Sequence, residues 1–169
     1  PPKPQNPKTP LYFSVFLIKF TIVFKMESTD TKKFKAAIIG ATGGIGKHLI
    51  KNLAMHDRCE KITVLVRRKL EEWDTEEIKA KLNVVECEDM GKMADLKSEF
   101  EDHDMFYCCL GSRVGNGKEL FTKVDYQYPL DFANLAKSVG AKGYILTSSI
   151  GANPNAWSLY TKTKGQVEE

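Results

Sequence analysis

The sequence lacks an apolar run long enough to cross a membrane as a helix. Its most apolar stretch, Leu11–Phe24, spans 14 residues and is interrupted by Lys19, whereas a membrane-spanning helix needs about 20 apolar residues. The residues from Phe24 to Glu27 include no small-residue cleavage site of the kind that ends a signal peptide. We therefore expect no membrane span and a cytoplasmic location.

Metal-binding patterns are also missing. The chain has four cysteines and three histidines, and no cysteine stands in a Cys-x-x-Cys pair with a companion histidine pair. Cys108 and Cys109 lie in the apolar run 105–110, where a free cysteine behaves as a small buried hydrophobic residue. We expect no metal site, and reduced thiols in the core.

Charge and proline are distributed unevenly. The formal net charge is +3, but the bases in residues 1–25 have no acid among them, so the remainder is close to neutral. This balance disfavours a nucleic-acid-binding surface. Five of the seven prolines fall within the first ten residues. We expect residues 1–32 to be an extension outside the core, disordered or partly helical, and residues 33–169 to form one domain.

From residue 34 onward, short apolar runs alternate with longer amphipathic segments. This alternation predicts right-handed β-α-β crossovers and a doubly wound parallel α/β sheet, the Rossmann architecture. Helical spacing is found in 44–56, in 89–100 and in 118–139, the last with a bend at Pro129. The five expected strands are 34–39, 61–66, 82–86, 105–110 and 144–147.

A glycine-rich turn, Gly-Ala-Thr-Gly-Gly-Ile-Gly at 40–46, joins the first strand to the first helix. Such a turn lets the backbone approach a pyrophosphate, which then lies at the positive end of the helix. The P-loop of nucleotide triphosphatases is excluded by two mismatches. It needs a glycine at position 41, where this sequence has alanine, and a Ser or Thr after Lys47, where it has His48. The residues expected to bind the dinucleotide here are Gly40, Thr42, Gly43, Gly44, Ile45 and Gly46.

The end of the second strand bears on the choice between NAD and NADP. An NAD site usually has an acid about 20 residues beyond the glycines, but this sequence has Arg67, Arg68 and Lys69. Guanidinium groups suit a 2′-phosphate, which an acid would repel. NADP is therefore favoured over NAD, with Arg67 and Arg68 as binding residues; the alternative is a solvated basic turn.

Beyond the fifth strand the chain carries Ser148, Ser149 and then Tyr160 and Lys164. Positions i and i+4 share one face of a helix, so we expect Tyr160 and Lys164 to point together toward the cofactor. A neighbouring ammonium favours the phenolate form and suits a tyrosine for general acid/base catalysis. Ser149, or its neighbour Ser148, would hold the substrate oxygen.

These motifs together resemble the short-chain dehydrogenase/reductase superfamily. The segments 40–43, 106–111, 124–126 and 148–149, with Tyr160-x-x-x-Lys164, are most similar to its Tat-interacting oxidoreductase subfamily. The resemblance implies Ser149, Tyr160 and Lys164 as catalytic residues, with Tyr160 and Lys164 also near the cofactor. It further implies that Leu110, Gly111 and Ser112 pass beside the cofactor.

The resemblance also sets an expectation about what lies beyond Glu169. Members of the family continue with further strands, so we expect the 33–169 domain to be incomplete at its C-terminus and to leave the last strand with an open edge. Three functions stay open: an NADP-dependent oxidoreductase acting on an unidentified carbonyl or alcohol, an NADPH-binding adaptor acting through protein partners, and a fragment with no activity.

Overall fold

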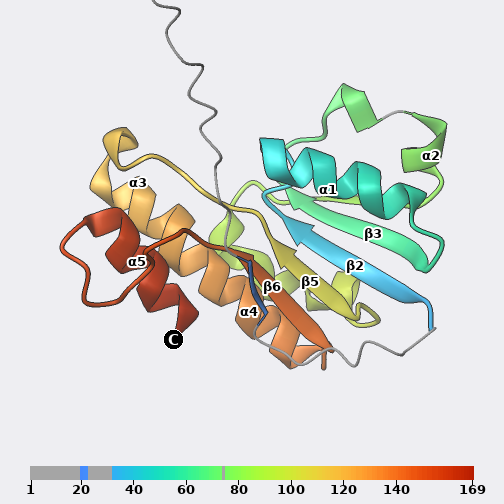
Figure 1. Cartoon of the computed structure of the whole chain (residues 1–169). Helices are drawn as coiled ribbons and strands as arrows, with labels where there is room; N and C mark the ends of the chain where they lie inside the picture. Colours follow the sequence, from blue (N-terminus) through green and yellow to red (C-terminus); the bar gives the residue numbers. More distant parts are fainter. Residues whose placement is uncertain (1–19, 23–31, 74) are drawn as a thin grey trace, which may run out of the picture.

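The computed structural model describes residues 20–22, 32–73 and 75–169. They form a six-stranded sheet in the order β1-β6-β5-β2-β3-β4 (Figure 1). All neighbouring pairs from β6 to β4 run parallel, which confirms the predicted doubly wound architecture. The five parallel strands are β2 (Phe34–Ile39), β3 (Cys59–Val66), β4 (Leu82–Glu86), β5 (Met105–Cys108) and β6 (Gly143–Thr147).

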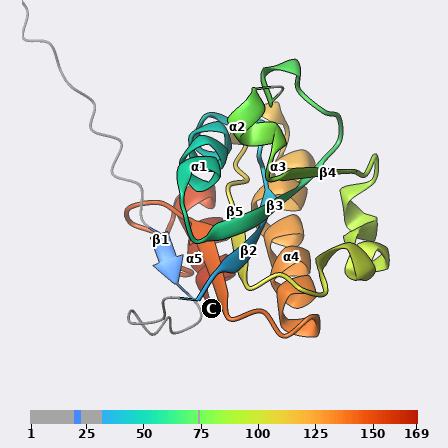
Figure 2. The same ribbon diagram turned by 90° about the vertical axis from the view of Figure 1, so that its right-hand side faces the viewer.

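Helices cover both faces of the sheet, as Figure 2 shows in an edge-on view. Alternate residues of β2 enter two cores, because strand side chains alternate between the faces. Ala36 and Ile38 pack with α1 (Gly44–Met55) and α2 (Glu76–Lys79). Ala37 and Ile39 pack on the other face with η2 (Met90–Phe100), α4 (Tyr128–Ser138) and α5 (Leu159–Glu168). A single 3₁₀ turn, η1 (Glu71–Trp73), contributes Trp73 to the core beneath α1 and α2.

Two segments expected to be helices are helical but are not continuous α-helices. The segment predicted over 89–100 is the 3₁₀ helix η2, with non-helical backbone at Lys92 and Leu96. Its buried Met90 and Met93 are three residues apart, a spacing that suits a 3₁₀ helix as well as an α-helix. The pattern therefore identified the buried face but not the helix type.

The helix predicted over 118–139 is divided. It consists of α3 (Lys118–Thr122), the π-helical segment η4 (Lys123–Gln127) and α4, preceded by the 3₁₀ turn η3 (Val114–Asn116). Pro129 has no N–H to donate to the carbonyl of Asp125 four residues earlier, which interrupts the α-helical pattern. We expected a bend at Pro129; the structure instead has a π-helical segment before it, and Pro129 lies in the first turn of α4.

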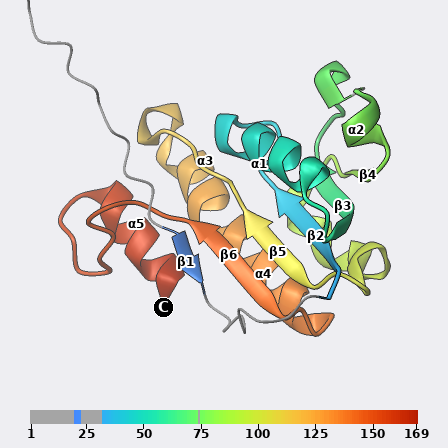
Figure 3. The same cartoon turned by 45° about the vertical axis from the view of Figure 1, so that its right-hand side comes forward.

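Part of the N-terminal extension belongs to the sheet. Strand β1 (Phe20–Ile22) lies antiparallel to β6, with Phe20 opposite Thr147 and Ile22 opposite Ile145 (Figure 3). The expectation of a disordered or partly helical extension outside the core is therefore wrong for residues 20–22. The edge of β6, which we expected to be open, pairs with β1. The rest of the extension up to residue 31 lies outside the described residues.

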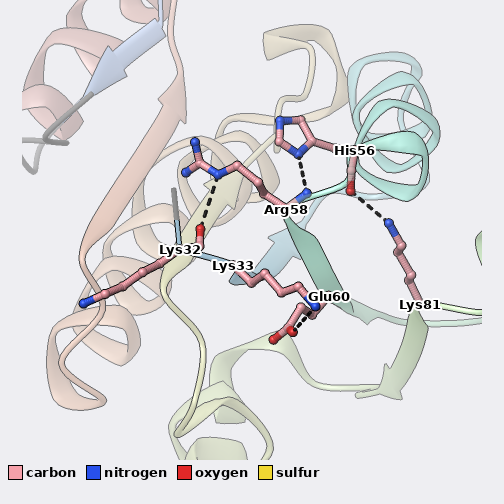
Figure 4. Close-up of polar contacts among 6 residues, drawn as sticks. All are labelled: Lys32, Lys33, His56, Arg58, Glu60 and Lys81. Atoms are coloured by element: carbon pink, nitrogen blue, oxygen red, sulfur yellow. Dashed lines mark hydrogen bonds and ion pairs between the residues drawn. The ribbon is translucent and has the colours of Figure 1, made fainter. Parts of the chain in front are cut away.

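Charged side chains join the amino ends of the strands (Figure 4). Arg58 Nε donates to the carbonyl oxygen of Lys32 at 3.3 Å, and Lys81 Nζ donates to that of His56 at 2.9 Å. Lys33 forms an exposed ion pair with Glu60 at 3.3 Å. These contacts hold together the starts of β2, β3 and β4, at the edge opposite the glycine-rich turn.

Candidate functional site

The glycine-rich turn follows β2 and leads directly into α1. Gly40 has φ of +79°, a conformation that glycine adopts without strain. The N–H of Gly43 donates to the Gly40 carbonyl at 3.1 Å, and the N–H of Lys47 donates to the Gly43 carbonyl at 2.9 Å. No side chain caps α1 at Gly43. The first N–H groups of α1 can therefore serve an anionic ligand such as a phosphate.

The turn meets the segment that follows β5. A Cβ on Gly40 would lie 2.5 Å from the carbonyl carbon of Cys109 and 2.7 Å from the nitrogen of Leu110. The N–H of Cys109 donates to the Ile39 carbonyl at 2.9 Å. Two segments predicted to bind the cofactor, 40–46 and 110–112, are thus adjacent. They lie where β2 has β5 on one side and β3 on the other, the point at which doubly wound sheets bind their ligands.

Cys108 and Cys109, next to this junction, pack in the two cores of the domain. Cys108 is fully buried and Cys109 is partly buried. Burial raises the pKa of both thiols, that of Cys109 to about 12. Both remain protonated at neutral pH, as expected for packing residues.

Arg67 and Arg68 stand at the same edge of the sheet. Leu65 pairs with Ile39 across β3 and β2, so Arg67, two residues further on, is level with the beginning of the glycine-rich turn. Both arginine side chains are exposed. They therefore follow β3 at the same end of the sheet as the glycine-rich turn.

Two serines follow β6 at this edge. Ser148 is 6% exposed and Ser149 is half-buried. The buried Oγ atoms of both have no hydrogen-bond partner among the described residues. Since an unpaired buried hydroxyl costs about 1–3 kcal/mol, these two groups fit a site that a ligand oxygen completes.

Helix α5 supplies Tyr160 and Lys164, but their side chains have different surroundings. The ring of Tyr160 is 37% exposed and packs against Phe121, with ring centroids 6.1 Å apart. Lys164 is buried, and its Nζ lies 2.9 Å from Oδ1 of Asp125. The expected helix is present, and its buried lysine is directed to a carboxylate.

Asp125 belongs to the segment 124–126 that carries part of the family resemblance, but the sequence analysis gave it no role in the site. It lies in the π-helical segment η4, fully buried, and its Oδ2 accepts hydrogen bonds from Ser112 N at 2.8 Å and Ser112 Oγ at 2.6 Å. A signal was available, because Asp125 stands four residues after the buried Phe121 and four before the buried Pro129. An acid on an apolar helical stripe indicates a buried polar contact.

The geometry brings most of the predicted residues to one edge of the sheet. The glycine-rich turn, Leu110–Ser112 and Lys164 are linked by contacts through Cys109 and Asp125. Ser148, Ser149 and the two arginines follow strands that end at this edge. The arrangement offers helix N–H groups, cations and unpaired hydroxyls to a phosphate-bearing ligand.

Comparisons with known proteins agree with this arrangement. A family model described as NAD(P)H-binding matches residues 40–168. The rat Protein HTATIP2 is 38% identical over 154 residues, which confirms the resemblance to the Tat-interacting subfamily. The match covers 90% of this chain and 60% of the rat protein. The FMP52 protein of Candida albicans is 34% identical over 136 residues, covering 78% of this chain and 58% of that protein. The chain thus spans about 60% of the length of the curated relatives it matches.

Solved structures show the same fold at lower identity. Pen from Bacillus thuringiensis matches with a TM-score of 0.68 and 19% identity, covering 80% of this chain and 43% of that one. A UDP-glucuronic acid 4-epimerase from Bacillus cereus, solved in complex with NAD, matches with a TM-score of 0.64 and 18% identity, covering 79% and 50%. These two structures support the Rossmann-like architecture.

The expected cytoplasmic location needs correction. The FMP52 relatives from several fungi are named as mitochondrial proteins, which contradicts that expectation. Within the described ranges, no helix has the length and apolar character needed to cross a membrane.

Proposed function

Because the chain belongs to the NAD(P)H-binding family, whose model spans residues 40–168, we propose that it binds NADPH and catalyses hydride transfer between this cofactor and a carbonyl or alcohol. The observation that carries the proposal is the junction of the glycine-rich turn with the segment after β5. It lies at the ligand-binding point of the sheet. NADPH would supply or accept the hydride; the side chains bind, orient and move a proton.

The preference for NADPH rests on Arg67 and Arg68. Both are exposed at the end of β3, where an NAD site usually has an acid. A guanidinium group donates to phosphate oxygens in a forked geometry, and charge-assisted hydrogen bonds are stronger than neutral ones. These arginines would therefore bind the 2′-phosphate that distinguishes NADPH from NADH.

The proton step is assigned to Tyr160. Its partly exposed ring lies on the helix that carries Lys164. The hydroxyl would donate a proton to the carbonyl oxygen during reduction and accept one from the alcohol during oxidation. Lys164 would bind the nicotinamide ribose, and the unpaired Oγ of Ser149, or of Ser148, would hold the substrate oxygen.

Cofactor titration tests this proposal first. The chain is titrated with NADPH and with NADH while nicotinamide fluorescence is followed, together with Arg67→Ala. Loss of a charge-assisted hydrogen bond predicts at least about tenfold weaker NADPH binding with NADH binding unchanged. Arg58→Ala is the matched control, because Arg58 bonds a backbone carbonyl at the opposite edge. Binding of neither cofactor, or equal weakening of both by Arg67→Ala, would contradict the proposal.

A second candidate function, NADPH-dependent binding of a protein partner, is favoured by Trp157 and Ile150. The Trp157 side chain is fully exposed and Ile150 is 59% exposed, both between β6 and α5. Exposed apolar side chains that gather into one patch often mark an interaction surface. Tyr160→Phe separates the two functions, since it removes the hydroxyl and keeps the ring. An enzyme loses about 100-fold or more in turnover of carbonyl substrates with NADPH binding retained, whereas a binding protein keeps its cellular effect.

A further inference from the structure

Asp125 joins two segments of the candidate site that are far apart in sequence. One carboxylate oxygen pairs with Lys164 Nζ on α5 at 2.9 Å, and the other accepts two hydrogen bonds from Ser112 after β5. The Asp125 and Lys164 side chains are 0% and 3% exposed. A buried charge pair is costly to desolvate and is tolerated where geometry and further hydrogen bonds compensate. Here Ser112 supplies those hydrogen bonds.

The local backbone explains how Asp125 reaches both partners. It lies in the π-helical segment η4, four residues before Pro129. The missing N–H of proline frees the Asp125 carbonyl from the α-helical pattern, and π-helical turns inside helices are frequent at functional sites.

We propose that Asp125 is a positioning residue that fixes the Lys164 ammonium and the Ser112 segment for the nicotinamide ribose; this rests on the proposed function. A lysine ammonium has three hydrogen-bond donors. The ion pair with Asp125 at 2.9 Å would hold the ammonium in place, so that its donors can serve the two ribose hydroxyls. Without this contact the flexible four-carbon side chain would have to be ordered by the cofactor itself, which weakens binding.

A double-mutant cycle tests the coupling. NADPH dissociation constants and bound-nicotinamide emission are measured for the parent chain, Asp125→Asn, Lys164→Met and the double variant. Asparagine keeps the acceptor for Ser112 and removes the charge. We expect Asp125→Asn to weaken NADPH binding about tenfold in the parent and to have little effect when Lys164 is already methionine. Asp131→Asn, on α4 and bonded to Gln127, is the matched control with unchanged binding.

The outcomes are distinguishable. If the parent binds NADPH and Asp125→Asn binds it equally well, or if the weakening is the same in both backgrounds, the positioning role is overturned and the proposed function stands. If the parent binds neither cofactor, both fail. If Asp125→Asn or Lys164→Met does not unfold cooperatively in urea, Ser112→Ala is measured in place of that variant. Ser112→Ala removes one hydrogen bond to Asp125. A severalfold weaker dissociation constant for Ser112→Ala supports the proposal, and an unchanged one overturns it.

Discussion

Gly46 lies so close to the carbonyl oxygen of Gly40 that a Cβ on Gly46 would overlap it. The same Cβ would lie 2.7 Å from the Cα of Ala41. This approach packs the start of α1 onto the end of β2 and shapes the turn between them. Gly46→Ala should therefore displace α1 from the sheet, at a cost of about 1–3 kcal/mol in unfolding free energy, and weaken NADPH binding severalfold.

Gly44 provides the control for this prediction. A Cβ at Gly44 has no atom within 4 Å, and Gly44 is the first residue of α1. Gly44→Ala should leave the unfolding free energy unchanged or raise it slightly, because alanine favours the helix. Urea denaturation and NADPH titration measure both variants, and equal effects of the two would argue against the packing explanation.

The buried His103 should make stability depend on pH. Its Nε2 lies 2.8 Å from Thr63 Oγ1, and burial lowers the pKa of His103 to about 4. In the unfolded chain the His103 imidazole binds its proton near pH 6.5, whereas in the folded chain it does so only near pH 4. The contribution of neutral His103 to stability is therefore complete above pH 6.5 and is lost as the pH falls from 6.5 to 4. The loss approaches about 3 kcal/mol at its limit.

His103→Gln should flatten this part of the stability curve. Urea unfolding is followed at pH 7.5 and pH 5.0 for the parent, His103→Gln and the exposed-site control His48→Gln. The parent and His48→Gln should lose similar stability between the two pH values, and His103→Gln should lose less. A His103→Gln chain with the full pH dependence of the parent would rule out His103 as its source.

The two kinds of ion pair in this chain should respond differently to mutation. Lys164→Met leaves the Asp125 carboxylate buried without its cation and should cost about 3–5 kcal/mol. Lys123 and Glu119 form an exposed pair at 3.1 Å on one helical surface, and Lys123→Met should cause no measurable change in the urea midpoint. Similar midpoints for the two variants would refute the predicted importance of the buried pair.

Strand β1 should protect the edge of β6. A chain that begins at Met26 lacks the residues that pair with Ile145, Leu146 and Thr147. Backbone N–H groups of β6 that face β1 should then exchange with solvent at least about tenfold faster, since they lose their partner. Hydrogen exchange read out by NMR gives rates for single amides, with β4 at the far edge as the internal reference. Unchanged rates in β6 would contradict the pairing.

The parallel sheet could be read from the sequence because its strands are short apolar runs bounded by polar residues. β2 and β4 begin and end where predicted, and α1 follows the glycine-rich turn. β3 begins two residues early, at Cys59, and β5 stops at Cys108. Strand ends are set by pairing with neighbours, which residue patterns do not contain.

The sequence analysis missed β1 and the partner of Lys164, because both depend on contacts between residues far apart in the sequence. β1 is a strand because β6 lies beside it, and no alternation of its three residues signals this. The partner of Lys164 is on another helix, and its role follows from burial of both charges rather than from the Tyr-x-x-x-Lys spacing. Helix spacing places Tyr160 and Lys164 on one face, but the tertiary structure decides which of them is buried.

The central position of β2 also affects how the chain folds during synthesis. β2 pairs with β3 soon after it in sequence, but its other partner, β5, is translated only after six intervening elements. Until residues 105–108 leave the ribosome, one edge of β2 has no native neighbour. Pairing over such a sequence separation slows folding and exposes the nascent chain to aggregation. Expression at low temperature or with chaperones should therefore increase the yield of folded protein.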